Sequence, residues 1–155
     1  MNKSHEKISP LKFIISGGGT GGHIFPAIAI ANALKKIHPQ SEILFVGAEG
    51  KMEMEKVPQA GYKIIGLPIR GIQRKMSLKN VWVPFRLLVS LFKARSIIRN
   101  FNPHAVIGVG GYASAAILYM ASFKKIKCYI QEQNSFPGVT NKLLASRVDR
   151  IFVAF

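Results

Sequence analysis

Short apolar segments alternate with longer helical stretches along this chain, and the alternation limits its fold more than any other feature. Most of the apolar segments are apolar on both faces, which is typical of parallel strands covered by helices on both sides. They predict strands at residues 12–16, 42–48, 63–67, 105–109, 127–131 and 150–154. Helices are predicted between them at residues 24–37, 52–60, 84–101, 113–122 and 139–146. The pattern predicts an α/β fold, a doubly wound parallel sheet with right-handed crossovers.

Length and charge narrow the choice further. The 155 residues suit one domain, and residues 1–10 are predicted to be a polar N-terminal extension. With 22 basic and 7 acidic residues the net charge is +15, which predicts an anionic partner: a nucleic acid, a phosphorylated substrate or an acidic membrane surface. The single cysteine, Cys128, excludes an internal disulfide. Residues 68–80 are expected to form an exposed loop.

A glycine-rich loop follows the first predicted strand. Residues 17–23 have the sequence GGGTGGH, with five glycines in six positions before His23. Glycine tolerates positive φ and lets backbone amides approach a ligand closely. Pro26 has no N–H and belongs in the first helical turn, so His23 is expected at or just before the start of the helix. A diphosphate at this turn would meet free amides and the positive end of the helix dipole.

The same loop allows a second interpretation. Gly17, Gly19 and Gly22 match the pattern G-x-G-x-x-G of dinucleotide-binding folds, and Glu49 lies where such a site needs an acidic residue. A P-loop is excluded, because Lys and then Ser or Thr would have to follow Gly22, whereas the chain continues with His and Ile. A tight turn with glycines used only for packing is the less favoured alternative.

Two more candidate turns follow the fourth and fifth predicted strands. Residues 108–114 have the sequence GVGGYAS, and residues 131–135 have the sequence QEQNS. In a sheet of strand order 3-2-1-4-5-6, strands one and four flank the switch point, so both glycine loops are expected to open into one crevice. Glu132, the only acidic residue between Glu55 and Asp149, would orient sugar hydroxyls or act as a general base there. A helix-capping or ion-paired Glu132 is the alternative.

The excess positive charge is local. Between Glu55 and Glu132 the chain has thirteen basic residues and no acidic one. On one helix, cations seven positions apart would form a line with Trp82 and Val89 beside it. The predicted membrane patch of cations and an exposed aromatic group comprises Arg74, Lys75, Lys79, Trp82, Arg86 and Lys93. A separate stripe, expected to face the core, comprises Val81, Phe85, Leu88 and Phe92. The alternative is a solvated helix face that carries one Trp.

Together, GGGTGGH, GVGGY and EQN, in this order and on these strands, resemble the motifs of the MurG family, the UDP-N-acetylglucosamine:lipid I N-acetylglucosaminyltransferases of bacterial peptidoglycan synthesis. Met52-Glu53 and Leu143 also fit, and the resemblance covers roughly Leu11 to Phe155. It implies the amino-terminal, Rossmann-like half of a GT-B glycosyltransferase. Residues 11–155 would be the acceptor-binding domain, and the carboxy-terminal donor-binding domain is expected to be absent from this chain.

The resemblance also implies roles for residues of the three motifs. His23 and Glu132 are the candidates for the catalytic base. The residues implied for UDP-GlcNAc are Thr20, Gly21, Gly22 and Asn134. Those implied for the acceptor diphosphate are Gly18, Gly19, Gly110, Gly111 and Tyr112. No cofactor is expected and no metal ligand is assigned. One departure is Gln131, where many members of the family have His.

The implied reaction is inverting transfer of GlcNAc from UDP-GlcNAc to the MurNAc 4-hydroxyl of lipid I, at the cytoplasmic face of the bacterial inner membrane. The expected partners are both substrates, an anionic membrane surface and a donor-binding domain in cis or in trans, without which the chain is expected to have little or no activity. A nicotinamide-dinucleotide-binding oxidoreductase domain is the alternative from another class. A basic nucleic-acid-binding module is the least favoured.

Overall fold

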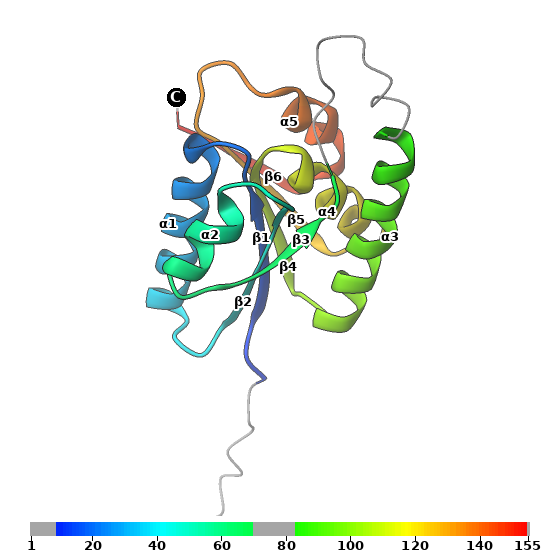
Figure 1. The fold of residues 1–155 in the computed structure, drawn as a ribbon. Helices are drawn as coiled ribbons and strands as arrows, with labels where there is room; N and C mark the ends of the chain where they lie inside the picture. The colour runs from blue at the N-terminus through cyan, green and yellow to red at the C-terminus, as the bar shows by residue number, and fades with distance from the viewer. Residues whose placement is uncertain (1–8, 70–82, 155) are drawn as a thin grey trace, which may run out of the picture.

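The computed structural model describes residues 9–69 and 83–154. In these ranges the chain forms one parallel sheet with strand order β3-β2-β1-β4-β5-β6 (Figure 1). The strands are β1 (Lys12–Gly17), β2 (Glu42–Ala48), β3 (Lys63–Leu67), β4 (Ala105–Gly110), β5 (Lys127–Glu132) and β6 (Arg150–Val153). The helices are α1 (Gly21–Ile37), α2 (Glu53–Gln59), α3 (Val83–Phe101), α4 (Tyr112–Phe123) and α5 (Val139–Leu144), with a short 3₁₀ helix at Ala145–Arg147. The predicted fold class and strand order are confirmed.

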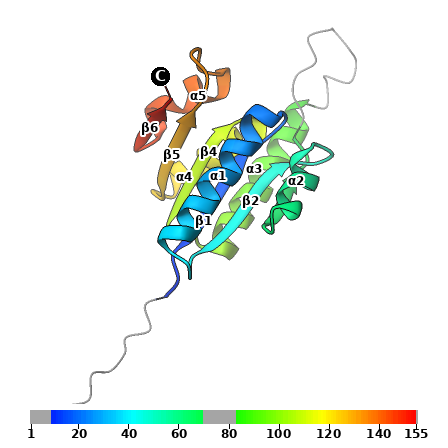
Figure 2. The ribbon, with the colours of Figure 1, turned by 90° about the vertical axis from the view of Figure 1, so that its left-hand side faces the viewer.

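Helices cover both faces of the sheet (Figures 1 and 2). Because successive side chains of a strand point to opposite faces, the neighbours Ile14 and Ile15 of β1 enter two different cores. The core that contains Ile15 is closed by α1 and α2, and the core that contains Ile14 is closed by α3, α4 and α5. This two-sided burial explains why the strands are apolar on both faces.

Helix α1 begins earlier than the sequence pattern predicts. Its first residue is Gly21, so His23 lies within the first turn and Pro26 lies in the second turn. The backbone N–H groups of His23 and Ile24 both bond to the carbonyl of Thr20, at 3.1 and 3.2 Å. The helix therefore starts directly from the glycine loop, and Pro26 costs it only one internal hydrogen bond.

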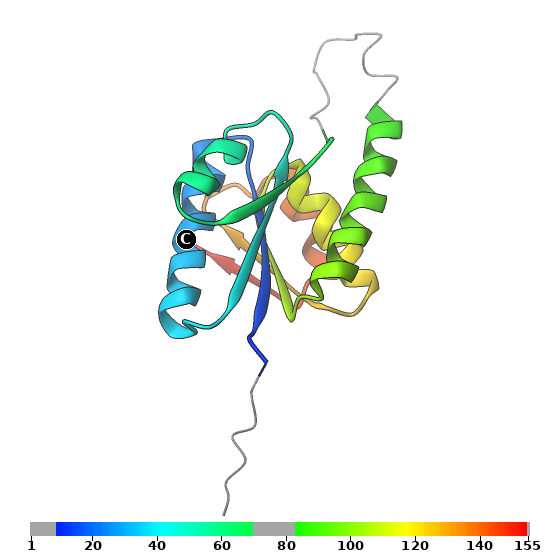
Figure 3. The same cartoon turned by 60° about the horizontal axis from the view of Figure 1, so that its bottom comes forward.

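The apolar stripe of α3 is not where the sequence pattern places it. Phe85, Leu88 and Phe92 are predicted to lie in the core, but their exposed fractions are 59%, 55% and 72%. Helix α3 packs mainly on α4 and lies at the outer edge of its layer (Figure 3). Only a narrow stripe of its surface is therefore buried. That buried stripe comprises Ser90, Ala94, Ile97 and Ile98. Val81 lies outside the described residues.

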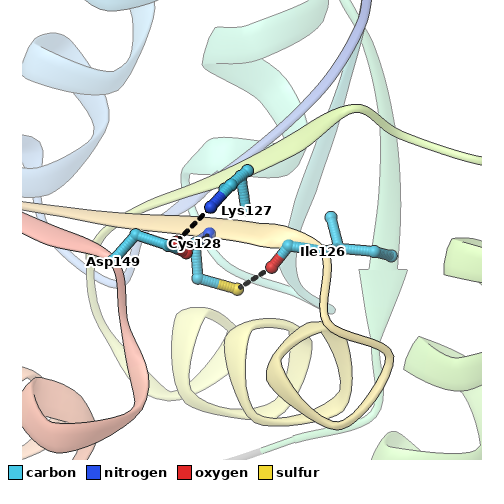
Figure 4. A network of polar contacts seen from close by, with 4 residues as sticks. All are labelled: Ile126, Lys127, Cys128 and Asp149. Atoms are coloured by element: carbon cyan, nitrogen blue, oxygen red, sulfur yellow. Dashed lines mark hydrogen bonds and ion pairs between the residues drawn. The ribbon is translucent and has the colours of Figure 1, made fainter.

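A polar network fixes the start of β5 against the segment that leads to β6 (Figure 4). The Asp149 carboxylate accepts hydrogen bonds from the backbone N–H of Cys128 and from Lys127 Nζ, both at 2.8 Å. In return the Asp149 N–H donates to the Cys128 carbonyl at 2.8 Å. The Cys128 thiol is buried and donates to the carbonyl of Ile126 at 3.2 Å. Across the described ranges, no helix is long and apolar enough to cross a membrane.

Candidate functional site

A cleft of about 510 Å³ lies at the carboxyl ends of the central strands. Both glycine loops line it, so the prediction that they open into one crevice is confirmed. From the first loop the lining residues are Gly18, Gly19, Thr20 and His23, and from the second they are Gly111, Tyr112 and Ala113. The turn between β2 and α2 completes the wall with residues 48–51 and Glu53, together with Ile69. The cleft therefore opens where the strand order reverses, between β1 and β4.

Glu53 holds the first glycine loop in place. Its side chain is fully buried, and its carboxylate accepts hydrogen bonds from the backbone N–H of Gly19 at 2.9 Å and of Ala48 at 3.0 Å. A β-carbon on Gly18 would lie 2.1 Å from Glu53 Oε1, and one on Gly47 would lie 2.6 Å from Glu53 Cγ. Both glycines are therefore needed to make room for this side chain. Because Gly19 gives its N–H to Glu53, that amide is not open to a ligand.

The two glycine loops touch through their backbones. A β-carbon on Gly111, which has a φ of +91°, would lie 2.6 Å from the carbonyl oxygen of Gly18. A β-carbon on Gly110 would lie 2.7 Å from Cε1 of His23, so the imidazole ring rests against this glycine. Glycine at these two positions thus permits contacts that any other residue would block.

The start of α1 has free amides next to Thr20, which lines the cleft. Thr20 is the N-cap residue and its side chain makes no capping hydrogen bond. Gly21 and Gly22 are the first two residues of the helix, whose N–H groups have no carbonyl partner within it. These amides and the positive end of the helix dipole form an anion-binding position.

The charged side chains of the cleft lining are the carboxylates of Glu49 and Glu53 and the cation Lys51. Glu49 is neutralised by Lys93, whose Nζ lies 2.9 Å from Glu49 Oε1. Glu53 is buried and bonded to amides, which leaves the cation Lys51 in the lining. Glu49, the acidic group that a dinucleotide ribose would need, is engaged by Lys93 in a half-exposed ion pair.

The buried carboxylate of Glu132 holds the third motif in place through hydrogen bonds. It accepts four hydrogen bonds of 2.9 to 3.0 Å, from the backbone N–H groups of Asn134 and Gly138 and from the side-chain amides of Asn134 and Asn141. Burial raises the pKa of Glu132, but these hydrogen bonds outweigh it and hold the pKa below its ordinary value. The carboxylate is therefore charged and saturated, and a saturated carboxylate is poorly suited to accept a proton from a substrate.

The third motif reaches the first loop through Gln133. The amide Nε2 of Gln133 lies 2.7 Å from Nδ1 of His23, which joins the end of β5 to the start of α1. Asn134 is exposed beside it, with its side chain held by Glu132. The three motifs are thus brought together around His23.

The remaining predicted site residues are placed as follows. Tyr112 is half-exposed at the first position of α4 and lines the cleft. Arg86 and Lys93 lie on α3, and Lys93 is paired with Glu49. Four residues of the predicted membrane patch lie outside the described residues: Arg74, Lys75, Lys79 and Trp82.

The sequence pattern does not single out Glu53, Lys51 or Gln133. Glu53 fits the family pattern, and it follows a strand end on the same edge as the glycine loops. The rule that ligands bind beyond the carboxyl ends of strands would have pointed to the turn that holds Lys51 and Glu53. Nothing in the sequence indicates the contact of Gln133 with His23, because 110 positions separate the two residues.

Comparison with known proteins identifies the class of this fold and site. Residues 13–153 match the model of the glycosyltransferase family 28 N-terminal domain. The fold and the glycine-lined cleft thus define the N-terminal domain of a glycosyltransferase. The chain belongs to glycosyltransferase family 28.

Nearly the whole chain is similar to curated proteins and to a solved structure. The chain is 62% identical to a UDP-N-acetylglucosamine--N-acetylmuramyl-(pentapeptide) pyrophosphoryl-undecaprenol N-acetylglucosamine transferase of Phocaeicola vulgatus, over 94% of this chain and 39% of the relative. It is 60% identical to the protein of the same name from Flavobacterium psychrophilum, over 93% of this chain and 39% of the relative. The crystal structure of Acinetobacter baumannii MurG superposes with a TM-score of 0.82 at 28% identity, over 94% of this chain and 42% of that one. The resemblance to the MurG family is confirmed.

The chain spans about two fifths of the length of these relatives. A UDP-GlcNAc 2-epimerase from Neisseria meningitidis, bound to UDP-GlcNAc, superposes with a TM-score of 0.62 at 14% identity, over 92% of this chain and 40% of that one, and shares the fold alone. The comparisons give no support to the oxidoreductase alternative.

Proposed function

We propose that this chain is the acceptor- and membrane-binding half of a transferase that moves GlcNAc from UDP-GlcNAc to lipid I. One observation carries the proposal: Thr20 at the N-cap of α1, the His23 imidazole and the second glycine loop all line one cleft, and the free amides of Gly21 and Gly22 follow Thr20 directly. A diphosphate-linked acceptor needs this combination of anion-binding amides beside a proton acceptor. The curated relatives, whose names state this reaction, support the same conclusion.

In this proposal His23 is the general base. As the 4-hydroxyl oxygen of the acceptor sugar forms a bond to C1 of GlcNAc, Nε2 of His23 takes the hydroxyl proton and the C1–O bond to UDP breaks with its electron pair. Attack from the face opposite to UDP inverts the configuration at C1. His23 lies in the first turn of α1 and lines the cleft. Glu132, whose carboxylate is saturated, holds the third loop instead.

The proposed substrate contacts divide between the loops. The acceptor diphosphate lies against Gly18 of the first loop and against Gly110, Gly111 and Tyr112 of the second. Lys51 is the cation of the cleft lining. UDP-GlcNAc approaches Thr20, Gly21 and Gly22 from the opposite side, where Asn134 is exposed and held in position by Glu132. A donor-binding domain, supplied in cis or in trans, completes the site.

The membrane contact is proposed for α3, at the cytoplasmic face of the inner membrane. The N-terminal half of this helix presents Phe85, Leu88 and Phe92, with Leu87 and Val89 beside them. Large apolar side chains on a helix of a strongly basic protein suit the interface of an anionic bilayer. Arg86 lies in the same segment.

Binding and reconstitution experiments test the proposal. Titration calorimetry of the chain with a short-chain lipid I analogue, UDP-GlcNAc or NADH is expected to give binding to the analogue and none to NADH. Turnover of lipid I to lipid II is expected only when a separately produced donor-binding domain of a relative is added. NADH binding without analogue binding, or full turnover by the chain alone, would contradict the proposal.

A further inference from the structure

The imidazole of His23 is held on two sides. Its Nδ1–Cε1 edge rests on Gly110, where a β-carbon would lie 2.8 Å from Nδ1, and the side-chain amide of Gln133 lies 2.7 Å from the same Nδ1. Among residues 9–69 and 83–154, no hydrogen bond to Nε2 is formed, and His23 lines the cleft. The ring therefore has one nitrogen engaged by protein and the other available to a ligand.

The contact between Gln133 and His23 couples the tautomer of the His23 ring to the orientation of the Gln133 side-chain amide. If Nε2 of Gln133 donates to Nδ1, then the ring proton is on Nε2, and this second nitrogen has no lone pair for a substrate proton. If the amide is turned by half a rotation, Oε1 accepts from Nδ1–H and the lone pair is on Nε2. Only the second arrangement is compatible with a general base.

The surroundings of the amide favour the second arrangement. With its nitrogen toward His23, Gln133 has a buried Oε1 that finds no hydrogen-bond donor among the described residues. Buried oxygens without a donor are rare in proteins. The half-turn gives the oxygen the Nδ1–H donor of His23 and places the amide NH2 in the position that the oxygen leaves. The 2.7 Å separation suits an N–H···O hydrogen bond.

We propose that Gln133 is a positioning residue that accepts Nδ1–H and thereby keeps the lone pair of His23 on Nε2, toward the cleft. The inference rests on the proposed function, in which His23 is the base. An amide fixes the tautomer without adding a negative charge. A carboxylate in its place would add charge beside a cleft that binds a diphosphate, so a neutral partner serves both needs.

Nitrogen-15 NMR of the imidazole ring tests the proposal directly. The chain has four histidines, so the His23 signals are assigned by their loss in His23→Gln. Spectra are recorded at about pH 8.5, two units above the ordinary imidazole pKa of about 6.5, where neutral tautomers dominate. The variants are Gln133→Met, which removes the acceptor, and Gln133→Glu, which keeps only acceptors. Gln131→Met is the matched control, because Gln131 is a neighbouring glutamine whose Oε1 is also buried.

The expected result is a protonated Nδ1 in the wild-type chain, in Gln133→Glu and in Gln131→Met. In Gln133→Met the ring is expected to change to the Nε2–H form that free imidazole prefers. An Nε2–H ring in the wild-type chain, or an unchanged Nδ1–H ring in Gln133→Met, overturns the proposal. If Gln133→Met does not fold, the wild-type and Gln133→Glu spectra decide, since Nε2–H in either one overturns it.

The tautomer measurement needs no activity, so it is separable from the proposed function. Full turnover by His23→Gln, in the chain supplemented with a donor-binding domain, would refute His23 as base and leave the tautomer result intact. Conversely, loss of turnover in His23→Gln with an Nε2–H ring in the wild-type chain would overturn the role of Gln133 alone.

Discussion

Gly18 and Glu53 fit together only because residue 18 has no side chain: a β-carbon there would lie 2.1 Å from Glu53 Oε1. The carboxylate cannot move aside cheaply, because it is fully buried and accepts hydrogen bonds from Gly19 and Ala48. The first glycine loop is thus shaped by a residue from the next helix.

A double-mutant cycle checks this relationship. Gly18→Ala is expected to lower the free energy of unfolding by about 1–3 kcal/mol, because the methyl group forces the Glu53 carboxylate off its amides. In a Glu53→Ala background the same change is expected to cost less, with a coupling of about 0.5–3 kcal/mol measured by urea denaturation. Gly138→Ala is the control, since a β-carbon there meets open space within 4 Å. Equal costs of Gly18→Ala in both backgrounds would argue against the contact.

The Glu132 network predicts a pH-dependent stability. Burial raises the pKa of Glu132, but the hydrogen bonds from Asn134, Gly138 and Asn141 hold it below the ordinary value of 4.5. A lowered pKa in the folded state means that the stabilisation is complete above pH 4.5 and is lost as the pH falls through the folded pKa. The difference in unfolding free energy between the wild-type chain and Glu132→Gln is therefore expected to shrink below about pH 4.5.

Denaturant titrations at several pH values measure this difference, in which the contribution of Asp149 cancels because both chains contain it. Asn141→Leu removes one donor to Glu132, so it is expected to raise the pKa of Glu132 and to shift the loss of stability to higher pH. A difference that stays constant from pH 7 to pH 3 would refute the role of the network.

Cys128 is expected to be unreactive in the folded chain. Burial, together with the negative charge of Asp149, raises the pKa of its thiol to about 12. Because the thiolate is the reacting form, alkylation by iodoacetamide at about pH 8 is expected to be limited by unfolding and to become fast in urea. A Cys128→Ala, Ser135→Cys variant is the control, since Ser135 is exposed and a thiol there should react in the folded state. Rapid alkylation of folded wild-type chain would contradict the burial of Cys128.

The exposed face of α3 is expected to bind anionic vesicles. Phe92→Ser removes a side chain that is 72% exposed, and the loss of roughly 1.5–3 kcal/mol of apolar burial in the bilayer is expected to weaken binding about tenfold or more. Phe136→Ser is the matched control, because Phe136 is 87% exposed but lies outside α3. Co-sedimentation with anionic and with neutral vesicles measures both. Equal losses in the two variants, or no dependence on lipid charge, would count against a membrane role of α3.

The architecture could be predicted from the sequence because its signal is local. Each strand is a short run of apolar residues, as in Phe13 to Ile15 of β1, and each helix follows a recognisable turn. The strand order 3-2-1-4-5-6 is a common one for doubly wound sheets, and it places both glycine loops at the same edge.

Features that depend on tertiary contacts could not be predicted in this way. The helical period of α3 identifies an apolar stripe, but only its packing on α4 shows that Ala94 and Ile98 are buried while Phe92 is exposed. In the same way, the EQN motif identifies Glu132 as a candidate site residue. Its hydrogen bonds from Gly138 and Asn141, which favour a structural role over that of a base, form only in the folded chain.

The contact between Gly111 and the Gly18 carbonyl has a consequence for engineering. Because the two backbones are in direct contact, a substitution that lengthens or reshapes one loop displaces the other. A library that aims at a different acceptor would have to vary the two loops as a matched pair. Transplanting either loop alone into another scaffold would carry over its sequence but not its shape.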